Sequence, residues 1–502
     1  EGKETLYQVL GVKKHIIKQN TKVKWYISCI YMISFFISLF SGIYTYEKTN
    51  GIFAILMFLF TFIPVSEIIL QIVQQILNKT IKPKLIPKMD FYNGIEKENA
   101  TMVVIPTIIN SKEKLQDLFG KLEVYYLANQ TENLYFTLLG DCSSEDQKTV
   151  KKDEEIINLG KELAKELNKK YEDRFFPKFH FLYRTRKWNE GEGSYLGWER
   201  KRGLLNQFNR YILEKEPSDF IVNTIEDYGE EIPKIKYVIT LDADTDLVLN
   251  SAFELVGAMA HILNKPVLDK EKNIVVEGHA LIQPKVGIDL IASRKTLFTK
   301  IFAGSGGTDL YTNAISDVYQ DNFGEGIFTG KGIYDISVFE QVLKNEIPEN
   351  TVLSHDLLEG CYLRCGLASD ILLMDGYPCK YNSFMSRLHR WIRGDWQISK
   401  WIKNKIIDKN GNKKKNPLNL LSKYKILDNL RRSMLEISCV LLVLFSFFLE
   451  AIDSISTLPF FLISFVAITI PMILEIINRV VHKKDGEKLQ KMFSPVMNGY
   501  HG

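Results

Sequence analysis

The chain has 502 residues, of which 46% are hydrophobic and 25% charged, so it can bury a large core and is neither disordered nor of low complexity. Its 64 basic and 60 acidic side chains give a net charge of +4, too balanced for a protein that binds nucleic acid through a basic surface. Six cysteines without a CxxC pair and eight histidines without HExxH indicate a reducing compartment and no evident zinc cluster. Because the first residue is Glu rather than Met, we expect a piece of a longer protein.

Apolar residues are concentrated at the two ends of the chain. Residues 25–46 carry no charge, and as a helix they are long enough to cross a hydrocarbon core of about 30 Å. A second apolar run begins at Ile52 and becomes more polar from Glu67 onward. Two further apolar runs cover 434–450 and 457–478. The sequence therefore predicts two pairs of membrane helices, with buried core helices as the alternative.

The charges that flank these runs predict an orientation. The two short loops within the pairs hold one basic residue, Lys48, whereas many basic residues lie outside the pairs. By the positive-inside tendency, both termini and the segment between the pairs face the cytoplasm. We therefore expect a multi-pass protein of the cell (inner) membrane, embedded in a lipid bilayer, with a cytosolic middle segment. The flanking residues are Lys13, Lys14, Lys18, Lys22, Lys24, Lys79, Lys82, Lys84, Lys88, Arg431, Arg432, Arg479, Lys483, Lys484, Lys488 and Lys491.

The middle segment alternates between predicted strands and helices. Residues 144–171 carry an apolar stripe at helical spacing, and 403–425 are rich in Lys and Asn, as in a linker. Alternation of this kind predicts an α/β fold with a mostly parallel sheet, whose binding sites lie beyond the carboxyl ends of the strands. The strand candidates are 101–105, 134–139, 179–183, 236–241 and 274–282.

Acidic residues follow two of these strands. Asp242 and Asp244 come directly after 236–241, and two carboxylates at this spacing can bind a divalent cation that neutralises a leaving diphosphate. An acidic turn exposed to solvent is the alternative, but the position at a strand end favours the metal site. Asp141 ends another apparent strand, where it can bind a nucleobase or ribose, or belong to the N-cap region of a helix.

Three further motifs carry charge or a base. Lys201 and Arg202 precede an apolar helix, where cations indicate a phosphate site or else a solvated basic face. Asp356 in Ser-His-Asp can act as a general base or as a helix N-cap. Residues 387–396 hold three arginines and two tryptophans, which suit phosphate and sugar rings; an interfacial amphipathic helix is the alternative.

Two nucleotide-binding signatures are disfavoured. The segment from Gly326 to Gly332, with Gly330 and Lys331, is one residue short of a P-loop and has Gly where Ser or Thr would meet magnesium. No GxGxxG follows the first predicted strand, which disfavours a dinucleotide enzyme.

Taken in chain order, these acidic and basic motifs resemble the D, DxD, D, (Q/R)xxRW pattern of processive, inverting family 2 glycosyltransferases such as cellulose and hyaluronan synthases. The carriers are Asp141, Asp242-x-Asp244, Asp356 and Arg387-x-x-Arg390-Trp391. A closer resemblance is to the glycosyltransferase family 84 part of cyclic β-1,2-glucan synthases. The first position of the last motif is Arg387 rather than Gln, which fits this family better than cellulose synthases. This resemblance is carried by LIPKMDFYNGI (85–95), VVIPTIINS (103–111), LEVYYLANQTENLYFTLLGD (122–141), RTRKWNEGEGSYLGWERKRGLLNQFNR (184–210), SDVYQDNFGEGIFTGKGIYD (316–335), PENTVLSHDLLEGCYLRCGLASD (348–370) and RLHRWIRGDWQ (387–397).

The resemblance implies a cytosolic GT-A domain, a Rossmann-like α/β nucleotide-sugar fold, flanked by transmembrane helices. It implies UDP-glucose as donor, Mg²⁺ or Mn²⁺ as cofactor, and elongation of a β-1,2-glucan with inversion. The cyclisation and phosphorylase-like domains of full-length relatives are missing here, so closed rings are not expected. The implied roles are uridine binding by Asp141, metal binding by Asp244 with Asp242, diphosphate binding by Arg387, Arg390, Lys201 and Arg202, acceptor binding by Trp391 and Trp396, and base catalysis by Asp356.

The sequence leaves two alternative functions to compare, and it predicts the organisation of the chain. Another processive synthase, making a cellulose-, chitin- or hyaluronan-like polymer, is the alternative function. A non-catalytic membrane scaffold is disfavoured because all four motifs are intact. The predicted parts are a cytosolic flank (1–24), a transmembrane helix pair (25–77), the GT-A domain (78–402), a linker and interfacial segment (403–432), a second transmembrane pair (433–479) and a cytosolic flank (480–502).

Overall fold

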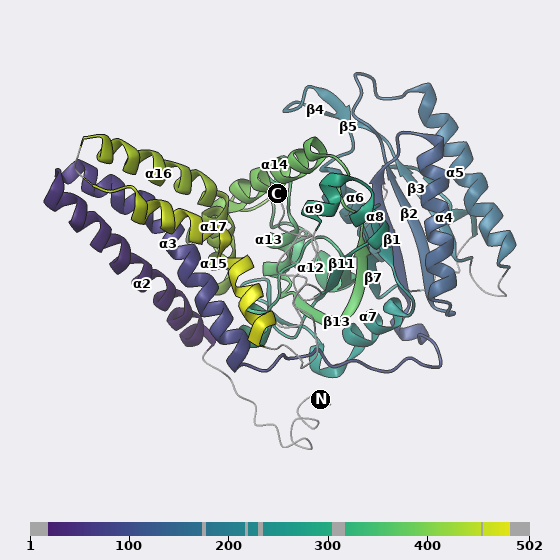
Figure 1. Ribbon diagram of the computed structural model, residues 1–502. Coiled ribbons are helices and arrows are strands. Elements are labelled where there is room, and N and C mark those ends of the chain that lie inside the picture. The colour runs from purple at the N-terminus through teal and green to yellow at the C-terminus, as the bar shows by residue number, and fades with distance from the viewer. Residues whose placement is uncertain are drawn as a thin grey trace, which may run out of the picture.

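A computed structural model shows an α/β domain beside a group of long apolar helices (Figure 1). Most of the two predicted flanks lies outside the residues that the structure describes, and the statements below concern the described residues. These are 19–172, 177–215, 219–228, 234–303, 317–452 and 455–481.

The α/β domain is built on a nine-stranded sheet in the order β6-β3-β2-β1-β7-β12-β11-β13-β8. β3, β2, β1 and β7 are parallel neighbours, and so are β11 and β13. β12 is antiparallel to both β7 and β11, so β1, β2, β3, β7, β11 and β13 all end at one edge, where β12 begins. The strands are β1 (Thr101–Ile108), β2 (Leu134–Asp141), β3 (Phe179–Arg184), β6 (Phe220–Asn223), β7 (Tyr237–Thr240), β8 (Thr245–Leu247), β11 (Leu281–Ile288), β12 (Gly332–Asp335) and β13 (Gly366–Asp375).

Helices cover both faces of this sheet because its central strands are apolar on both sides (Figure 1). Val103 and Ile105 of β1 pack in one core with α4, α5 and α7, whereas Met102 and Val104 pack in another with α6, α12 and α13. Gly160 lets α5 approach the sheet, since a Cβ there would lie 2.3 Å from the Phe181 ring. The helices are α4 (Lys112–Ala128), α5 (Lys151–Lys170), α6 (Arg200–Glu214), α7 (Ser251–Ala260), α12 (Ile336–Leu343) and α13 (Asp356–Tyr362).

Long apolar helices lie side by side at one end of the molecule (Figure 1). α2 (Gln19–Lys48) and α3 (Gly51–Thr80) are each long and apolar enough to cross a membrane. α15 (Leu420–Ser433) and α16 (Leu435–Ala451) pass that test only together, with a 45° bend between them. In α17 (Leu458–Val481) the apolar stretch 458–474 is shorter. Both helices of the first predicted pair are therefore long and apolar enough to span a membrane, whereas the second pair consists of one bent and one short element.

A buried polar group joins two of these helices, α3 and α15. Arg431 of α15 contacts Glu67 of α3 at 2.7 Å and Asp428 at 2.8 Å, and all three side chains are buried. Gln71 also donates to Glu67 at 2.7 Å. The polarity that enters the second apolar run at Glu67 therefore serves this junction.

Several shorter elements complete the fold. α14 (Tyr381–Ile398) runs between the α/β domain and the apolar helices (Figure 1). The others are the helices α8 (Leu290–Arg294), α9 (Leu297–Phe302) and α11 (Val318–Phe323), and the hairpins β4 (Lys187–Asn189) with β5 (Ser194–Leu196), β9 (Val267–Asp269) with β10 (Ile274–Glu277), and β14 (Lys405–Ile407) with β15 (Lys413–Lys415).

Three sequence-based boundaries were wrong. The predicted strand 274–282 is two strands in different sheets, because Gly278 adopts a φ of +69° between them. The helix predicted from residue 144 begins at Lys151, since the preceding residues pair with β5 through Glu145 instead. The linker 403–425 contains the β14–β15 hairpin and the start of α15.

Candidate active site

The structure brings the DxD motif together with two of the predicted cations. Asp242 and Asp244 follow β7 at the carboxyl edge of the sheet, and their side chains are 34% and 40% exposed. Lys201, in the first turn of α6, donates to Asp242 Oδ1 at 2.6 Å. Arg387, in α14, donates to Asp244 Oδ2 at 2.6 Å. Residues 41 and 143 positions away along the chain thus converge on one pair of carboxylates.

A second ion pair, which the sequence analysis missed, lies behind this motif. Lys331 Nζ contacts Asp375 and lies 3.5 Å from Asp242 Oδ2. Asp375 also accepts a hydrogen bond from Thr245 Oγ1 at 2.6 Å. The pairing of the strands explains this position, because β12 begins beside the end of β7 and β13 ends opposite Thr245. The sequence feature that could have identified Asp375 is its position as an acidic residue at the end of an apolar strand.

Opposite charges set the ionisation of this cluster. Burial disfavours the charged form of Asp242, but Lys201 and Lys331 outweigh it and hold the pKa of the carboxyl well below its ordinary value. Burial likewise disfavours charged Lys331, yet Asp242 and Asp375 raise the pKa of its ammonium. The pKa of Lys201 is raised against burial by Asp242 and Asp356. The site therefore holds fixed charges of both signs at neutral pH.

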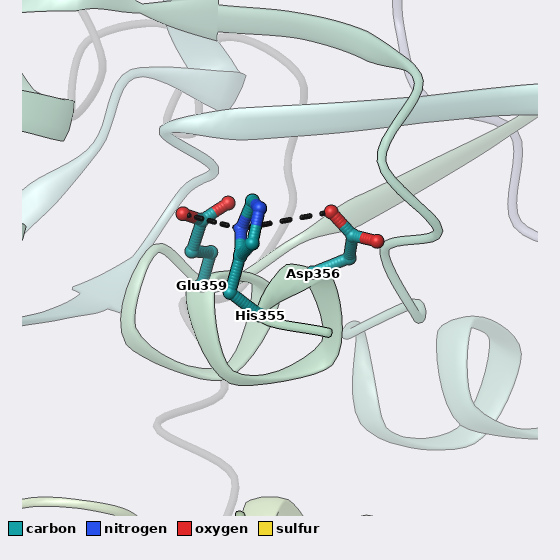
Figure 2. A group of neighbouring side chains, drawn as sticks. All are labelled: His355, Asp356 and Glu359. Atoms are coloured by element: carbon teal, nitrogen blue, oxygen red, sulfur yellow. Dashed lines mark ion pairs between the residues drawn. The ribbon is translucent and has the colours of Figure 1, made fainter. Parts of the chain in front are cut away.

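Asp356 begins α13 beside two other titratable side chains (Figure 2). His355 lies between Asp356 and Glu359, with its Nδ1 2.8 Å from Glu359 Oε1 and 3.7 Å from Asp356 Oδ1. His355 and Glu359 are buried, whereas the Asp356 side chain is 26% exposed. Burial opposes protonation of His355, but the two carboxylates raise its pKa overall. Of this group, Asp356 is thus the member that a substrate can reach.

Asp356 belongs to the same site as the DxD motif. Its carboxylate lies against Gly330, where a Cβ would come within 2.9 Å of Oδ1. The Gly330 carbonyl accepts a hydrogen bond of 3.0 Å from Lys201, the residue that also donates to Asp242. A glycine is required here for a second reason, because its φ is +89°. One short loop therefore joins the DxD motif to the predicted base.

Two groups of side chains in the described part of the chain offer ligands for a cation. The donor atoms of His355, Asp356 and Glu359 lie within 4.8 Å of one another, close enough to hold one metal ion. Asp242 and Asp244 supply only hard carboxylate oxygens and are more exposed, which fits Mg²⁺ or Mn²⁺ better. The donor set at the DxD motif therefore fits the metal that the resemblance implies.

Asp141 is held in a buried ion pair. Arg184, at the end of β3, donates from Nε and Nη2 to the two oxygens of Asp141 at 2.9 and 2.7 Å. Its remaining donors bind the carbonyls of Trp198 at 2.8 Å and Arg200 at 2.7 Å. The pair thus fixes the turn that leads into α6 and to Lys201, a role for which the sequence offered no signal.

The other predicted residues divide between the site and the helix junctions. Trp391 packs with Arg387, whose guanidinium carbon lies 5.7 Å from a Trp391 ring centroid. Arg202 is buried and pairs with Glu199. Arg390 is exposed on α14. Trp396, nine residues after Arg387 and so on the opposite helix face, donates to an oxygen of α15 at 3.1 Å. The structure therefore does not bring Trp396 to the carboxylates.

The comparisons with known proteins agree with this organisation. No protein-family model matches the chain. The chain is 35% identical over 434 residues, which is 85% of its length, to the cyclic β-(1,2)-glucan synthase NdvB of Rhizobium meliloti (strain 1021). The match spans 15% of the length of that relative. The resemblance is confirmed, and the chain belongs to the same family as this segment of the cyclic β-(1,2)-glucan synthase.

Proposed function

We propose that the chain is a membrane-bound inverting glucosyltransferase that elongates a β-1,2-glucan from UDP-glucose with the help of Mg²⁺ or Mn²⁺. One observation carries this proposal: Asp242, Asp244 and Asp356 meet Lys201 and Arg387 at one edge of the sheet. Hard oxygen ligands, cations for a diphosphate and a separate carboxylate are the groups that transfer from a nucleotide sugar requires. The similarity to a glucan synthase supports the choice of a sugar polymer as product.

The donor would lie over the carboxyl ends of the central strands. Asp242 and Asp244 would hold the metal, which when bound neutralises charge that develops on the departing diphosphate. Lys201 and Arg387 already face these carboxylates and would turn toward the phosphate oxygens, with exposed Arg390 nearby on α14.

Two further residues complete the proposed donor site. Asp141 would contact the uridine as part of its pair with Arg184. Arg202 pairs with Glu199, so it would bind the diphosphate only by exchanging that carboxylate for a phosphate oxygen.

Asp356 is the proposed base. As the acceptor oxygen bonds to the anomeric carbon, its proton passes to an Asp356 oxygen. The bond from that carbon to the diphosphate breaks, and UDP leaves with the electron pair. A single displacement of this kind inverts the anomeric centre. The partial exposure of Asp356 next to Lys201 and Gly330 supports the assignment.

The acceptor glucan would bind along α14. Trp391 offers a ring face beside Arg387, and a stacked sugar there would approach the base from the side of the membrane helices. The same role predicted for Trp396 is not supported by its position, because its indole is bonded to Ser433 of α15.

The apolar helices would hold this site at the cytoplasmic face of the cell membrane. Basic residues at the outer ends of both helix pairs support a cytoplasmic catalytic domain and cytoplasmic termini. The domain limits 25–77, 78–402 and 433–479 remain our proposal for this arrangement. Cyclisation and phosphorylase-like domains in a longer chain would act on the product as partners.

Transfer from radiolabelled UDP-glucose by the chain purified in detergent tests the proposal. We expect metal-dependent incorporation that EDTA abolishes, and linkage analysis should find 1,2-linked glucose. UDP-N-acetylglucosamine serves as the competing donor. A preference for that donor, or another linkage, would indicate a different processive synthase, and no transfer from either donor would refute the function.

A further inference from the structure

The loop that precedes β12 contacts charged residues from several parts of the proposed site, namely Lys201, Asp242, Asp356 and Asp375. The backbone amide and hydroxyl of Thr329 donate to the buried Gln283 side chain at 3.0 and 3.2 Å, which fixes the loop on β11. Gly330 follows, with its carbonyl toward Lys201 and its Cα toward Asp356. This is the segment that resembles a defective P-loop in sequence. In the fold it is a connection between the DxD motif and the base.

Lys331 in this loop is a mostly buried cation held by two carboxylates. Its side chain is 13% exposed, and its ammonium contacts Asp375, whose side chain is 7% exposed. Asp242 Oδ2 lies 3.5 Å away, while Asp242 Oδ1 is occupied by Lys201. Both oxygens of Asp242 therefore face a lysine, and Lys331 is the less exposed of the two.

The ion pairs give the site a nearly balanced charge. Its carboxylates are Asp242, Asp244, Asp356 and Asp375, and its cations are Lys201, Lys331 and Arg387. These seven side chains together carry one net negative charge when all are ionised, and exposed Arg390 on α14 would add one positive charge. A divalent cation alone, or a diphosphate alone, would disturb this balance, whereas the two together add almost no charge.

We propose that Lys331 is a positioning residue of the donor site, which balances the DxD carboxylates so that the metal and the nucleotide diphosphate bind as a pair. This inference rests on the proposed function. Lys331 would act through Asp242 and Asp375 rather than through contact with the transferred sugar. Removing its charge should leave the site too negative, favouring a free metal ion and disfavouring the diphosphate.

Binding titrations on the intact chain test this role. With Lys331→Met, we expect Mn²⁺ alone to bind about tenfold more tightly and UDP at saturating Mn²⁺ about tenfold more weakly, because one buried positive charge is gone. Lys331→Arg keeps the charge, so the dissociation constants for Mn²⁺ and for UDP should both return toward the wild-type values. Lys272→Met, in a surface pair with Asp269 on the β9–β10 connection, is the matched control and should change neither.

The two predicted changes in affinity, tighter for Mn²⁺ and weaker for UDP, have opposite signs, which separates this role from a structural one. A damaged site would lose affinity for Mn²⁺ and UDP together, and that result, or two unchanged constants, would overturn the inference while leaving the glucosyltransferase proposal standing. If the wild-type chain binds neither Mn²⁺ nor UDP, the proposed function and the inference both fail.

Discussion

Asp356 is the residue at which chemistry and donor binding can be separated. Its carboxylate is partly exposed beside Lys201, whereas the proposed diphosphate ligands lie on other elements. In Asp356→Asn we expect glucan synthesis to fall by about 10²-fold or more, because a positioned base contributes roughly that factor. The dissociation constant for UDP-glucose should change little. Radiolabelled transfer and binding titrations on the same preparations measure the two effects.

His355→Ala is the control for this assignment. His355 is buried behind Asp356 and held by Glu359, so it has no direct access to an acceptor. Its loss should cost less activity than Asp356→Asn. Retention of more than about a tenth of wild-type transfer by Asp356→Asn would contradict the base assignment, given the usual contribution of such a group.

Asp244 carries the second prediction at this scale. Removing one charged ligand from a Mg²⁺ or Mn²⁺ site usually abolishes tight binding, so Asp244→Asn should lose metal-dependent binding of UDP-glucose. Calorimetry with and without metal measures the difference. Asp246→Asn is a close control, since Asp246 is 46% exposed and bonds Lys121 and Tyr125 instead of the site cations. Undiminished metal-dependent binding in Asp244→Asn would place the metal elsewhere.

Trp391 and Trp396 differ in surroundings within one helix, which makes them a matched pair. In Trp391→Ala we expect polymer yield to fall much further than UDP-glucose hydrolysis, because water can attack the donor without an acceptor platform. Trp396→Ala removes a contact with Ser433 and should affect both reactions alike. Parallel assays of polymer and of free glucose measure the ratio of polymer synthesis to UDP-glucose hydrolysis. An equal loss of both activities in Trp391→Ala would contradict the role of Trp391 in binding the acceptor.

At the scale of elements, the contact between α3 and α15 depends on a buried charge group. Arg431→Met leaves Glu67 and Asp428 without their cation, and breaking such a buried pair typically costs about 3–5 kcal/mol. We expect a clear fall in the melting temperature in detergent. The exposed pair of Lys112 and Glu155 offers the comparison, because losing an ion pair in water should change the melting temperature little. Similar melting temperatures for the two variants would refute the role of the junction.

The sequence predicted the elements better than their connections. Apolar runs such as 101–105 and 134–139 lie within β1 and β2, because strands buried on both faces must be continuously apolar. The split at Gly278 was missed, since a positive φ leaves no trace in hydrophobic periodicity. Asp242, Asp244 and Asp356 were found because strand and helix ends are visible in sequence.

The partners of these carboxylates could not be predicted in the same way. Lys331 reaches Asp242 because β12 runs antiparallel between β7 and β11, which delivers residues from the start of a strand to an edge made of strand ends. Arg184 meets Asp141 through the pairing of β2 with β3. Such contacts depend on strand order, and spacing along the chain does not encode it.

At the scale of the whole molecule, one helix separates the proposed site from the apolar helices. α14 presents Arg387 to Asp244, while its other end contacts α15 through Asn429 with Asp395 at 3.0 Å and Trp396 with Ser433 at 3.1 Å. α15 continues into α16 after a bend of 45°. A tilt of α16 would therefore move α15 and, through these polar contacts, the residues that line the site.

This connection predicts that bilayer thickness affects the proposed reaction. Helices adjust their tilt when the hydrocarbon core is thicker or thinner than their apolar length, at a modest free-energy cost per ångström. In vesicles of lipids that differ only in acyl-chain length, we expect the transfer rate to pass through a maximum, while UDP binding stays constant. Trp396→Ala, which loosens α14 from α15, should flatten that dependence. A rate that is the same in thin and thick bilayers would show that the membrane serves only as an anchor.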